Sequence, residues 1–194
     1  DCKPTNIEQF AVMGEIYSRV IFNNQNPRVG LLSIGEEEHK GNDLTRTATP
    51  LLKSLPIDFI GNVEGRDVYT GKVDVIVCDG FSGNIALKTA EGTARFVADL
   101  LRRAFSSSMR SKIGFLISRP ATELLRHHLD PNNHNGAVFL GLNGLVVKSH
   151  GGANETGVAN AIAVAAKSVR DDLARKIAED LKYFEAHEPE GAVA

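Results

Sequence analysis

The chain has 194 residues, a formal net charge of −2, 42% hydrophobic residues and no Trp. These values fit a globular domain with its own core and exclude a wholly disordered chain. No apolar run reaches the ~20 residues of a membrane-spanning helix, and the net charge gives no general attraction for nucleic acid. The two cysteines, Cys2 and Cys78, are too few for a disulfide framework or a four-cysteine zinc site, so we expect a reducing, cytoplasmic setting.

Apolar spacing and turn residues predict helices and strands that alternate along the chain. In chain order we expect a helix at 7–22, a strand at 29–34, a helix at 42–54, strands at 58–60 and 73–78, a helix at 83–105, a strand at 144–148 and a helix at 153–185. Residues 191–194 are expected to form a loose tail. This alternation predicts an α/β fold with a mainly parallel sheet covered on both faces.

Two of the predicted helices carry more specific patterns. The helix at 83–105 has an apolar stripe that we expect to be buried, formed by Leu87, Ala90, Ala94, Val97, Leu100 and Leu101. The last helix is charged in its second half, where Asp171 with Arg175 and Asp172 with Lys176 have the spacing of stabilising i,i+4 pairs.

Glycine-containing turns with polar residues follow three of the predicted strands, at 35–42, 79–84 and 148–152. Ligands of open α/β sheets bind at such turns, where strands end and helices begin. None of the three matches a dinucleotide or nucleoside triphosphate fingerprint, so those ligands are not indicated.

The turn at Lys148-Ser149-His150-Gly151-Gly152 is the best candidate for an anion site. Its glycines let backbone N–H groups approach a ligand, the following helix contributes its positive end, and Lys148 adds a full charge. Alternatively, the turn is an ordinary helix start preceded by a solvated lysine. His150 is either a proton or hydrogen-bond donor or a structural turn residue.

Other polar residues have a plain structural alternative. Asp79 is either a charged anchor beside the amides of its turn or the N-cap of the next helix, and Lys88 is either a site cation or a helix-surface lysine. Arg66 either grips phosphate or pairs with Glu64 in its loop. Cys78 has the place of a thiol nucleophile, but small cysteines are common in buried strands.

Metal binding is weakly indicated. The run Glu36-Glu37-Glu38 attracts attention, but consecutive residues point in different directions, and His127-His128 lacks further ligands at a recognised spacing. We therefore expect no metal.

Residues 101–129 differ from the rest because they are basic and amphipathic. Residues 102–128 hold six Lys or Arg and one acid, a net charge of +5, and Met109, Ile113, Leu116 and Ile117 share one helical face. Such a helical pair suits an anionic membrane, an acidic protein partner or a subunit interface, and alternatively packs on its own domain.

Four blocks in this order make the chain resemble the bacterial phosphate acyltransferases of phospholipid synthesis, from about Asp1 to Val169. The blocks are Gly35-Glu36-Glu37-Glu38 with Lys40-Gly41-Asn42; Asn62-Val63-Glu64-Gly65-Arg66-Asp67; Cys78-Asp79-Gly80-Phe81 with Gly83-Asn84 and Ala86-Leu87-Lys88; and Gly141-Leu142-Asn143-Gly144 with Lys148-Ser149-His150-Gly151. That family is longer at its N-terminus, so the resemblance implies a C-terminal portion of the enzyme.

The resemblance implies transfer of a fatty acyl group from acyl carrier protein to inorganic phosphate, whose product feeds a membrane glycerol-3-phosphate acyltransferase. It also implies a three-layer α/β/α fold like that of isopropylmalate dehydrogenases and phosphate acetyltransferases, with a protruding helical hairpin at 101–130. A homodimer, peripheral contact with anionic membrane and the absence of any cofactor are implied as well.

The residue roles rest on the resemblance together with the chemistry of each side chain. We expect Lys148, His150, Asp79 and Lys88 to act in catalysis, and Met109, Arg110, Lys112, Ile113, Leu116 and Ile117 to face a membrane or partner. Phosphate or substrate would be bound by Ser149, Gly151, Asn62, Glu64, Arg66, Gly80, Gly83 and Asn84. The alternatives are a short-chain acetyl- or butyryltransferase that uses coenzyme A thioesters, and a non-catalytic dimerisation or membrane-docking module.

Overall fold

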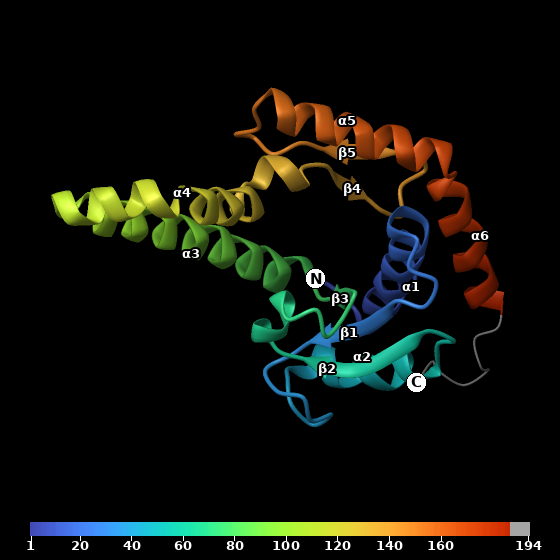
Figure 1. Ribbon diagram of the computed structural model, residues 1–194. Helices are drawn as coiled ribbons and strands as arrows, with labels where there is room; N and C mark the ends of the chain where they lie inside the picture. Colours follow the sequence, from blue (N-terminus) through green and yellow to red (C-terminus); the bar gives the residue numbers. More distant parts are fainter. Residues whose placement is uncertain (187–194) are drawn as a thin grey trace. The chain divides into compact units, whose positions relative to one another are not determined.

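The structure is a computed structural model that describes residues 1–186 (Figure 1), so the tail predicted at 191–194 lies outside the described residues. The chain divides into two compact units. The first comprises residues 1–82, 138–146 and the described residues from 165 onward, and the second comprises residues 83–137 and 147–164. Each unit is described by itself.

The first unit contains a parallel three-stranded sheet. Its strands are β1 (Arg28–Leu32), β2 (Asp58–Val63) and β3 (Val75–Val77), in the order β2-β1-β3 with both pairings parallel. Helix α2 (Asp43–Ser54) connects β1 to β2, and α1 (Pro4–Phe22) precedes the sheet. An α/β architecture with a mainly parallel sheet is thus confirmed, and β-branched residues supply β3 as their strand propensity predicts.

One face of β1 forms the centre of the core. Val29 and Leu31 alternate with Gly30, and both are fully buried against Ala11 of α1 and Leu52 of α2. Since alternate residues of a strand point to the same face, α1 and α2 cover the same side of the sheet. The packing of α1 and α2 on the sheet fixes the position of the edge at which β1, β2 and β3 end.

The C-terminal helical segment is broken, which corrects the single helix predicted at 153–185. Helix α5 (Glu155–Arg170) ends and α6 (Leu173–Ala186) begins around Asp172, whose φ of 56° lies in the left-handed region that Asp tolerates. The break redirects the charged side chains, so the two predicted i,i+4 pairs do not form.

The ion pairs that form instead join other partners. Asp171 pairs with Lys167 at 2.7 Å, whereas Asp172 pairs with Arg175, Oδ2 to Nε, at 2.5 Å. In α6, Leu173 and Ile177 are buried against Val12 and Ile16 of α1. Helix α1 therefore has two apolar stripes, one for the sheet side and one for α6.

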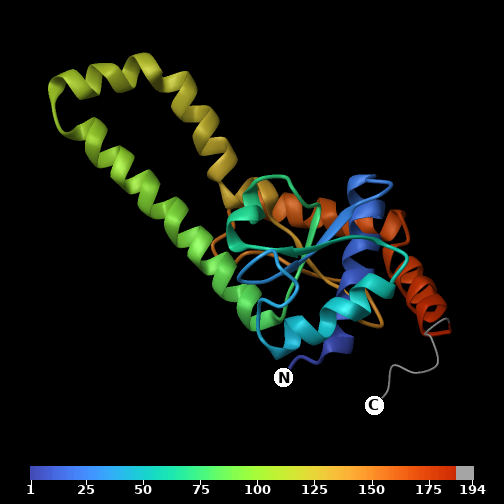
Figure 2. The same cartoon turned by 90° about the horizontal axis from the view of Figure 1, so that it is seen from below.

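The second unit is dominated by two consecutive long helices, α3 (Gly80–Ser106, within this unit from Gly83) and α4 (Met109–Leu129). Helix α4 contains Pro120 and bends along its length (Figure 2). Proline removes a helical hydrogen bond and bends the helix. Neither helix has a buried residue. The prediction of a buried stripe at 87–101 is therefore wrong: Leu87 is 63% and Leu100 53% exposed.

The apolar spacing at 83–105 correctly predicted a helix, but no described element packs against the apolar stripe closely enough to bury it. Large apolar side chains also stay exposed along α4, among them Met109, Leu116 and Ile117. An apolar stripe indicates only that a helix needs a partner surface, and it does not identify that surface.

Shorter elements complete the chain. A 3₁₀ turn, η1 (Gly65–Tyr69), follows β2, and another, η2 (Pro131–His134), follows α4. Strand β4 (Ala137–Phe139) pairs with β5 (Val146–Lys148). The sequence prediction missed β4, because three residues after Gly136 are too short for a periodic signal, and it started β5 two residues too early.

Candidate functional site

The turn that follows β5 is folded onto its own histidine. Lys148 is the last residue of β5, and Ser149 and His150 are half-buried. The Gly152 N–H donates to Nδ1 of His150 at 3.0 Å, and the Ala153 N–H donates to the His150 carbonyl at 3.0 Å. Because Nδ1 accepts a hydrogen bond, a neutral His150 carries its proton on Nε2, which is left as a donor.

The predicted anion-binding groups of this turn are accessible. Lys148 is exposed, and within the described residues its ammonium group forms no ion pair. Gly151 is exposed too, with open space where a side chain would stand. The turn therefore offers a free positive charge and an unobstructed backbone, as an anion site requires.

A buried asparagine that the sequence prediction missed holds this turn. The side chain of Asn135 donates from Nδ2 to Ser149 Oγ and to the Gly157 carbonyl, both at 2.8 Å. Its Oδ1 accepts from the His150 N–H at 2.8 Å and from the Gly136 N–H at 3.0 Å. Asn135 is 7% exposed and connects the turn to the first turn of α5.

The start of α5 is built around two more asparagines. Asn154 Oδ1 accepts from the Gly157 N–H at 3.0 Å, as an N-cap does, and the Asn154 N–H donates to Asn132 Oδ1 at 3.0 Å. Gly157 is required here because a Cβ would lie 2.5 Å from Asn132 Oδ1. The N-terminus of α5 is thereby fixed beside the predicted anion turn.

Lys88, on α3 in the same unit, is exposed and pairs with Glu91, Nζ to Oε2, at 2.9 Å. Its hydrogen bond lowers the pKa of Glu91, and the charge of His150 contributes in the same direction. The predicted residues Lys88 and His150 thus lie within electrostatic reach of the same carboxylate. Gly83 and Asn84 lie near the start of α3.

Asp79 follows β3 and caps α3. One carboxylate oxygen accepts from the Phe81 and Ser82 N–H groups, both at 2.9 Å, and the hydrogen bonds from Ser82 and Phe81 hold the pKa of Asp79 below its usual value. This is the capping role considered as an alternative from the sequence. Gly80 is the first residue of the capped helix.

The residues after β2 form a second set in the first unit. The Arg66 guanidinium pairs with Glu64, Nε to Oε2, at 3.0 Å, and its side chain is 71% exposed. Asn62 is buried, donates to the Glu37 carbonyl at 3.0 Å, and its Oδ1 has no hydrogen-bond partner among the described residues. A buried acceptor without a donor is costly.

The acidic run after β1 is engaged with lysines. Glu36 pairs with Lys72 at 2.6 Å, and Glu38 pairs with Lys53. Among the side chains that the structure describes, no three His, Cys, Asp or Glu gather as a metal site would need. The Cys78 thiol has a raised pKa, first because of burial and then because of the Asp79 charge, which disfavours the nucleophilic thiolate.

The predicted membrane or partner residues lie on α4. Ser108 caps this helix by accepting from the Ser111 N–H at 3.0 Å. Met109, Ile113, Leu116 and Ile117 are all exposed, Ile117 by 78%, and Arg110 and Lys112 are exposed beside them. The structure thus describes an uncovered apolar face with cations next to it, and no described helix is long and apolar enough to cross a membrane.

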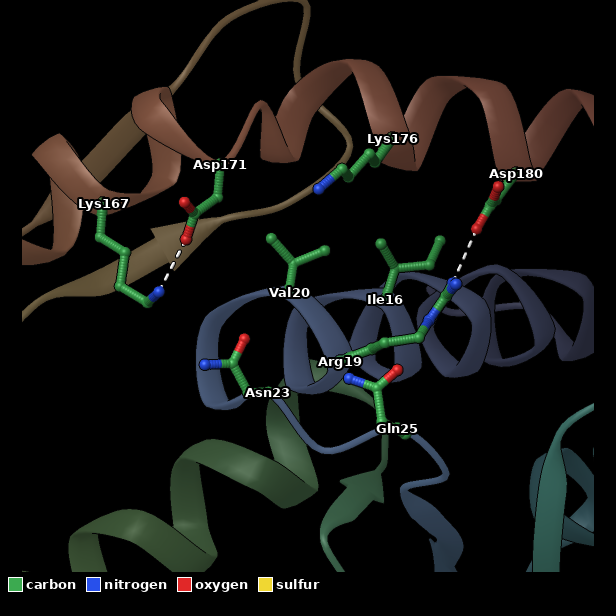
Figure 3. Close-up of a pocket in the computed structure, with 9 residues that line it drawn as sticks. All are labelled: Ile16, Arg19, Val20, Asn23, Gln25, Lys167, Asp171, Lys176 and Asp180. Atoms are coloured by element: carbon green, nitrogen blue, oxygen red, sulfur yellow. Dashed lines mark hydrogen bonds and ion pairs between the residues drawn. The ribbon is translucent and has the colours of Figure 1, made fainter.

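A cavity of about 590 Å³ lies in the first unit, between α1 and the segment from Lys167 to Asp180 (Figure 3). Two ion pairs cross it or flank it: Arg19 with Asp180 at 2.8 Å, and Lys167 with Asp171 at 2.7 Å. None of the predicted site residues lines it. The charges that line the cavity largely neutralise one another, so we interpret them as polar contacts that hold α6 on α1.

Comparison with known proteins finds relatives over most of the chain. A family model described as "Fatty acid synthesis protein" matches residues 1–176. The chain is 63% identical to the phosphate acyltransferase of Erythrobacter litoralis over 91% of its own length and 50% of the relative. It is 52% identical to the phosphate acyltransferase of Acidobacterium capsulatum over 86% of its length and 50% of the relative.

The phosphate acyltransferase of Paramagnetospirillum magneticum is 48% identical over 94% of the chain and 53% of that protein. The chain therefore spans about half the length of the curated relatives it matches. The matched region includes both sets of predicted site residues.

Proposed function

The chain belongs to the family of fatty acid synthesis proteins, and we propose that the whole protein transfers a fatty acyl group from acyl carrier protein to inorganic phosphate. The relatives are named phosphate acyltransferases, which supports phosphate as the acceptor. The acyl phosphate formed would supply a membrane glycerol-3-phosphate acyltransferase.

The observation that carries the proposal is the turn at Lys148-Ser149-His150-Gly151. It combines an ammonium that pairs with no described residue, a hydroxyl, open backbone at Gly151 and the N-terminus of α5, whose position the asparagine contacts fix. These are the groups that bind a phosphate dianion, and their preorganisation lowers the cost of binding it. Lys148 and Ser149 therefore hold phosphate in our proposal, with the Gly151 backbone.

The chemistry is acyl transfer by positioned phosphate. A phosphate oxygen attacks the thioester carbonyl carbon, a C–O bond forms, and the C–S bond breaks with the electron pair leaving on the carrier thiolate. Because phosphate is already ionised near neutral pH, the site needs proximity and charge stabilisation more than a strong base.

His150 fits the donor role in this reaction. Its Nδ1 accepts from the Gly152 N–H, so the neutral ring presents an Nε2–H donor. This donor would stabilise the carbonyl oxygen as it becomes negative, or give its proton to the departing sulfur. Lys88 is the second cation proposed for this charge, although it must first leave Glu91.

The residues after β2 and β3 are proposed to bind substrate. Asn62, whose buried Oδ1 has no hydrogen-bond partner among the described residues, is assigned to this set. Arg66 with Glu64 forms a charged pair that can exchange one partner for a substrate anion, and Asp79, Gly80, Gly83 and Asn84 supply the helix start beside β3.

For the fold of the whole protein we propose the three-layer α/β/α arrangement of isopropylmalate dehydrogenases and phosphate acetyltransferases. The parallel order β2-β1-β3 with helices packed on the sheet supports it. The basic segment at 101–130 is proposed as a helical hairpin formed by the end of α3 and by α4.

We further propose that this segment mediates homodimerisation and peripheral contact of a cytoplasmic protein with anionic membrane. The support is an apolar face that no described element covers and a net charge of +5 over residues 102–128, from six cations and one acid. Co-sedimentation with anionic vesicles tests the membrane part. Leu116→Glu with Ile117→Glu should reduce binding, whereas unchanged binding would remove residues 109–117 as the anchor.

The activity is tested by measuring phosphate-dependent release of free acyl carrier protein from a long-chain acyl donor. The chain is assayed as given and extended at its N-terminus to the length of its relatives. Lys148→Ala should raise the phosphate concentration needed for half-maximal rate, whereas Lys182→Ala, an exposed lysine on α6, should not. No release in either form would reject the proposal.

The same assay separates the coenzyme A alternative. A short-chain phosphate acetyl- or butyryltransferase would turn over acetyl- or butyryl-coenzyme A faster than any carrier-bound donor. The proposed enzyme should prefer the long-chain carrier-bound substrate, because the basic segment attracts an acidic carrier.

A further inference from the structure

Asn135 lies outside every sequence motif considered above, yet it makes four hydrogen bonds with the turn and its surroundings. We propose that Asn135 is a positioning residue that orients the Ser149 hydroxyl as a donor to phosphate. The inference rests on the proposed function, because it assigns a role within the same anion site.

The orientation of the Asn135 amide is determined by backbone groups. Its Oδ1 faces two N–H donors, those of Gly136 and His150, at 3.0 Å and 2.8 Å. Rotating the amide by 180° would place its NH₂ group against these two N–H groups and leave four donors without acceptors. Burial makes that arrangement expensive, so the NH₂ group stays on the other side.

The fixed NH₂ group in turn determines the direction of the Ser149 hydroxyl. One hydrogen of Nδ2 is used by the Gly157 carbonyl, and the other is donated to Ser149 Oγ at 2.8 Å. Since Oγ accepts this bond, its own hydrogen points away from Asn135. A hydroxyl whose oxygen already accepts one hydrogen bond readily donates its own hydrogen to an anion. The accepted hydrogen bond strengthens the donated one.

The same contacts fix the turn to α5. Gly157 lies in the first turn of that helix, so Asn135 joins the two parts of the proposed phosphate site, the loop and the helix N-terminus. An anion bound between them would meet groups already in place, and little ordering would remain to be paid on binding.

The test measures the dissociation constant for inorganic phosphate by isothermal titration calorimetry, using the chain extended to the length of its relatives. Asn135→Asp keeps the shape and the acceptor but removes both donors, so Ser149 would donate its hydrogen to the new carboxylate. We expect phosphate affinity to fall about tenfold or more. Asn135→Ala, which adds no charge, should also weaken binding, by a smaller factor.

The matched control is Asn133→Asp, which adds the same charge two residues away on η2. The Asn133 side chain donates to the His127 carbonyl at 2.8 Å, and it forms no hydrogen bond with the turn among the described residues. We expect phosphate affinity within twofold of wild type. An equal loss in both Asp variants would reduce the effect to added charge and overturn the proposal.

A double-mutant cycle with Ser149→Ala separates positioning from general damage. Because Asn135 acts through the hydroxyl and also holds the turn on α5, Asn135→Ala should weaken binding by a clearly smaller factor in the Ser149→Ala background than in the wild-type background. Full additivity, or wild-type affinity of Asn135→Ala, would overturn the inference. Amide hydrogen exchange of the His150 N–H provides a second readout, since it should accelerate in Asn135→Ala and stay unchanged in Asn133→Asp.

Failure of this inference and failure of the proposed function are distinguishable. Phosphate binding that depends on Asn135 without acyl transfer would reject the transferase and keep the positioning role. Acyl transfer together with phosphate binding that does not depend on Asn135 would reject the positioning role and keep the transferase. A wild-type protein that binds no phosphate would overturn both.

Discussion

Replacing Gly157 by Ala tests the packing around the start of α5. Within a helix, Gly→Ala ordinarily stabilises by about 1 kcal/mol. Here the new Cβ would lie 2.5 Å from Asn132 Oδ1 and 3.2 Å from Asn135 Nδ2. Asn132 must then move and lose the hydrogen bond from the Asn154 N–H.

The magnitude follows from the bonds lost. Displacing Asn132 and disturbing the two donations of Asn135 costs about 2–3 kcal/mol at about 1 kcal/mol for each hydrogen bond. Against the helical gain of about 1 kcal/mol, the net result is a loss of about 1–2 kcal/mol. Steric crowding therefore reverses the sign of an otherwise stabilising substitution.

Gly92→Ala is the matched control, because Gly92 lies within α3 and has open space where the Cβ would stand. It should stabilise its helix by up to about 1 kcal/mol. Urea unfolding gives the free energy of unfolding, and amide hydrogen exchange resolves α5 and α3 separately. If Gly157→Ala stabilises α5 as Gly92→Ala stabilises α3, the argument from the 2.5 Å contact is refuted.

Three further predictions concern the first unit. Hydrogen bonds from Ser82 and Phe81 lower the pKa of Asp79 on folding, so the contribution of Asp79 to the free energy of unfolding is complete above the unfolded pKa of about 3.9 and is lost as pH falls through the folded value. In urea titrations, the stability advantage of wild type over Asp79→Asn should shrink below about pH 4. A difference that stays constant with pH would contradict this. Burial raises the pKa of the Cys78 thiol, so iodoacetamide should modify Cys78 more slowly at pH 7 than it modifies free cysteine, and faster reaction would restore Cys78 as a candidate nucleophile. Leu52 is fully buried in the core, so Leu52→Ala should cost about 2–5 kcal/mol in urea unfolding, and a cost below about 1 kcal/mol would show that the core at α2 is loosely packed.

The sequence predicted the elements whose signals are local. Val73 to Cys78 is rich in β-branched residues, and β3 occupies its centre; the apolar spacing of residues 7–22 likewise corresponds to α1. The break at Asp172 was missed, since an acidic residue in a charged helix looks like a member of an i,i+4 pair. Only the contacts of Leu173 with α1 reveal why the helix restarts there.

Long-range contacts explain the rest of the difference. Asn135 sits in a run of Asn and His residues that reads as a turn, and nothing nearby indicates that its amide reaches Ser149 and Gly157, 14 and 22 residues later. Likewise, the stripe at 87–101 has the period of a buried face but no cover among the described elements. Periodicity reports which face needs a partner, and the partner itself is not encoded in the period.

The three cations considered for phosphate binding differ in the partners they already hold, and this difference ranks their contributions. Arg66 is bound to Glu64 at 3.0 Å and Lys88 to Glu91 at 2.9 Å, whereas Lys148 forms no ion pair among the described residues. Phosphate must displace a carboxylate to use Arg66 or Lys88, and the released carboxylate then repels it. Lys148 pays neither cost, and it adjoins Ser149 and the N-terminal end of α5, where backbone N–H groups add to its field. Removing its charge should therefore weaken phosphate binding more than removing that of Arg66 or Lys88. An affinity order with Arg66 or Lys88 ahead of Lys148 would mean that phosphate binds elsewhere than at the turn after β5.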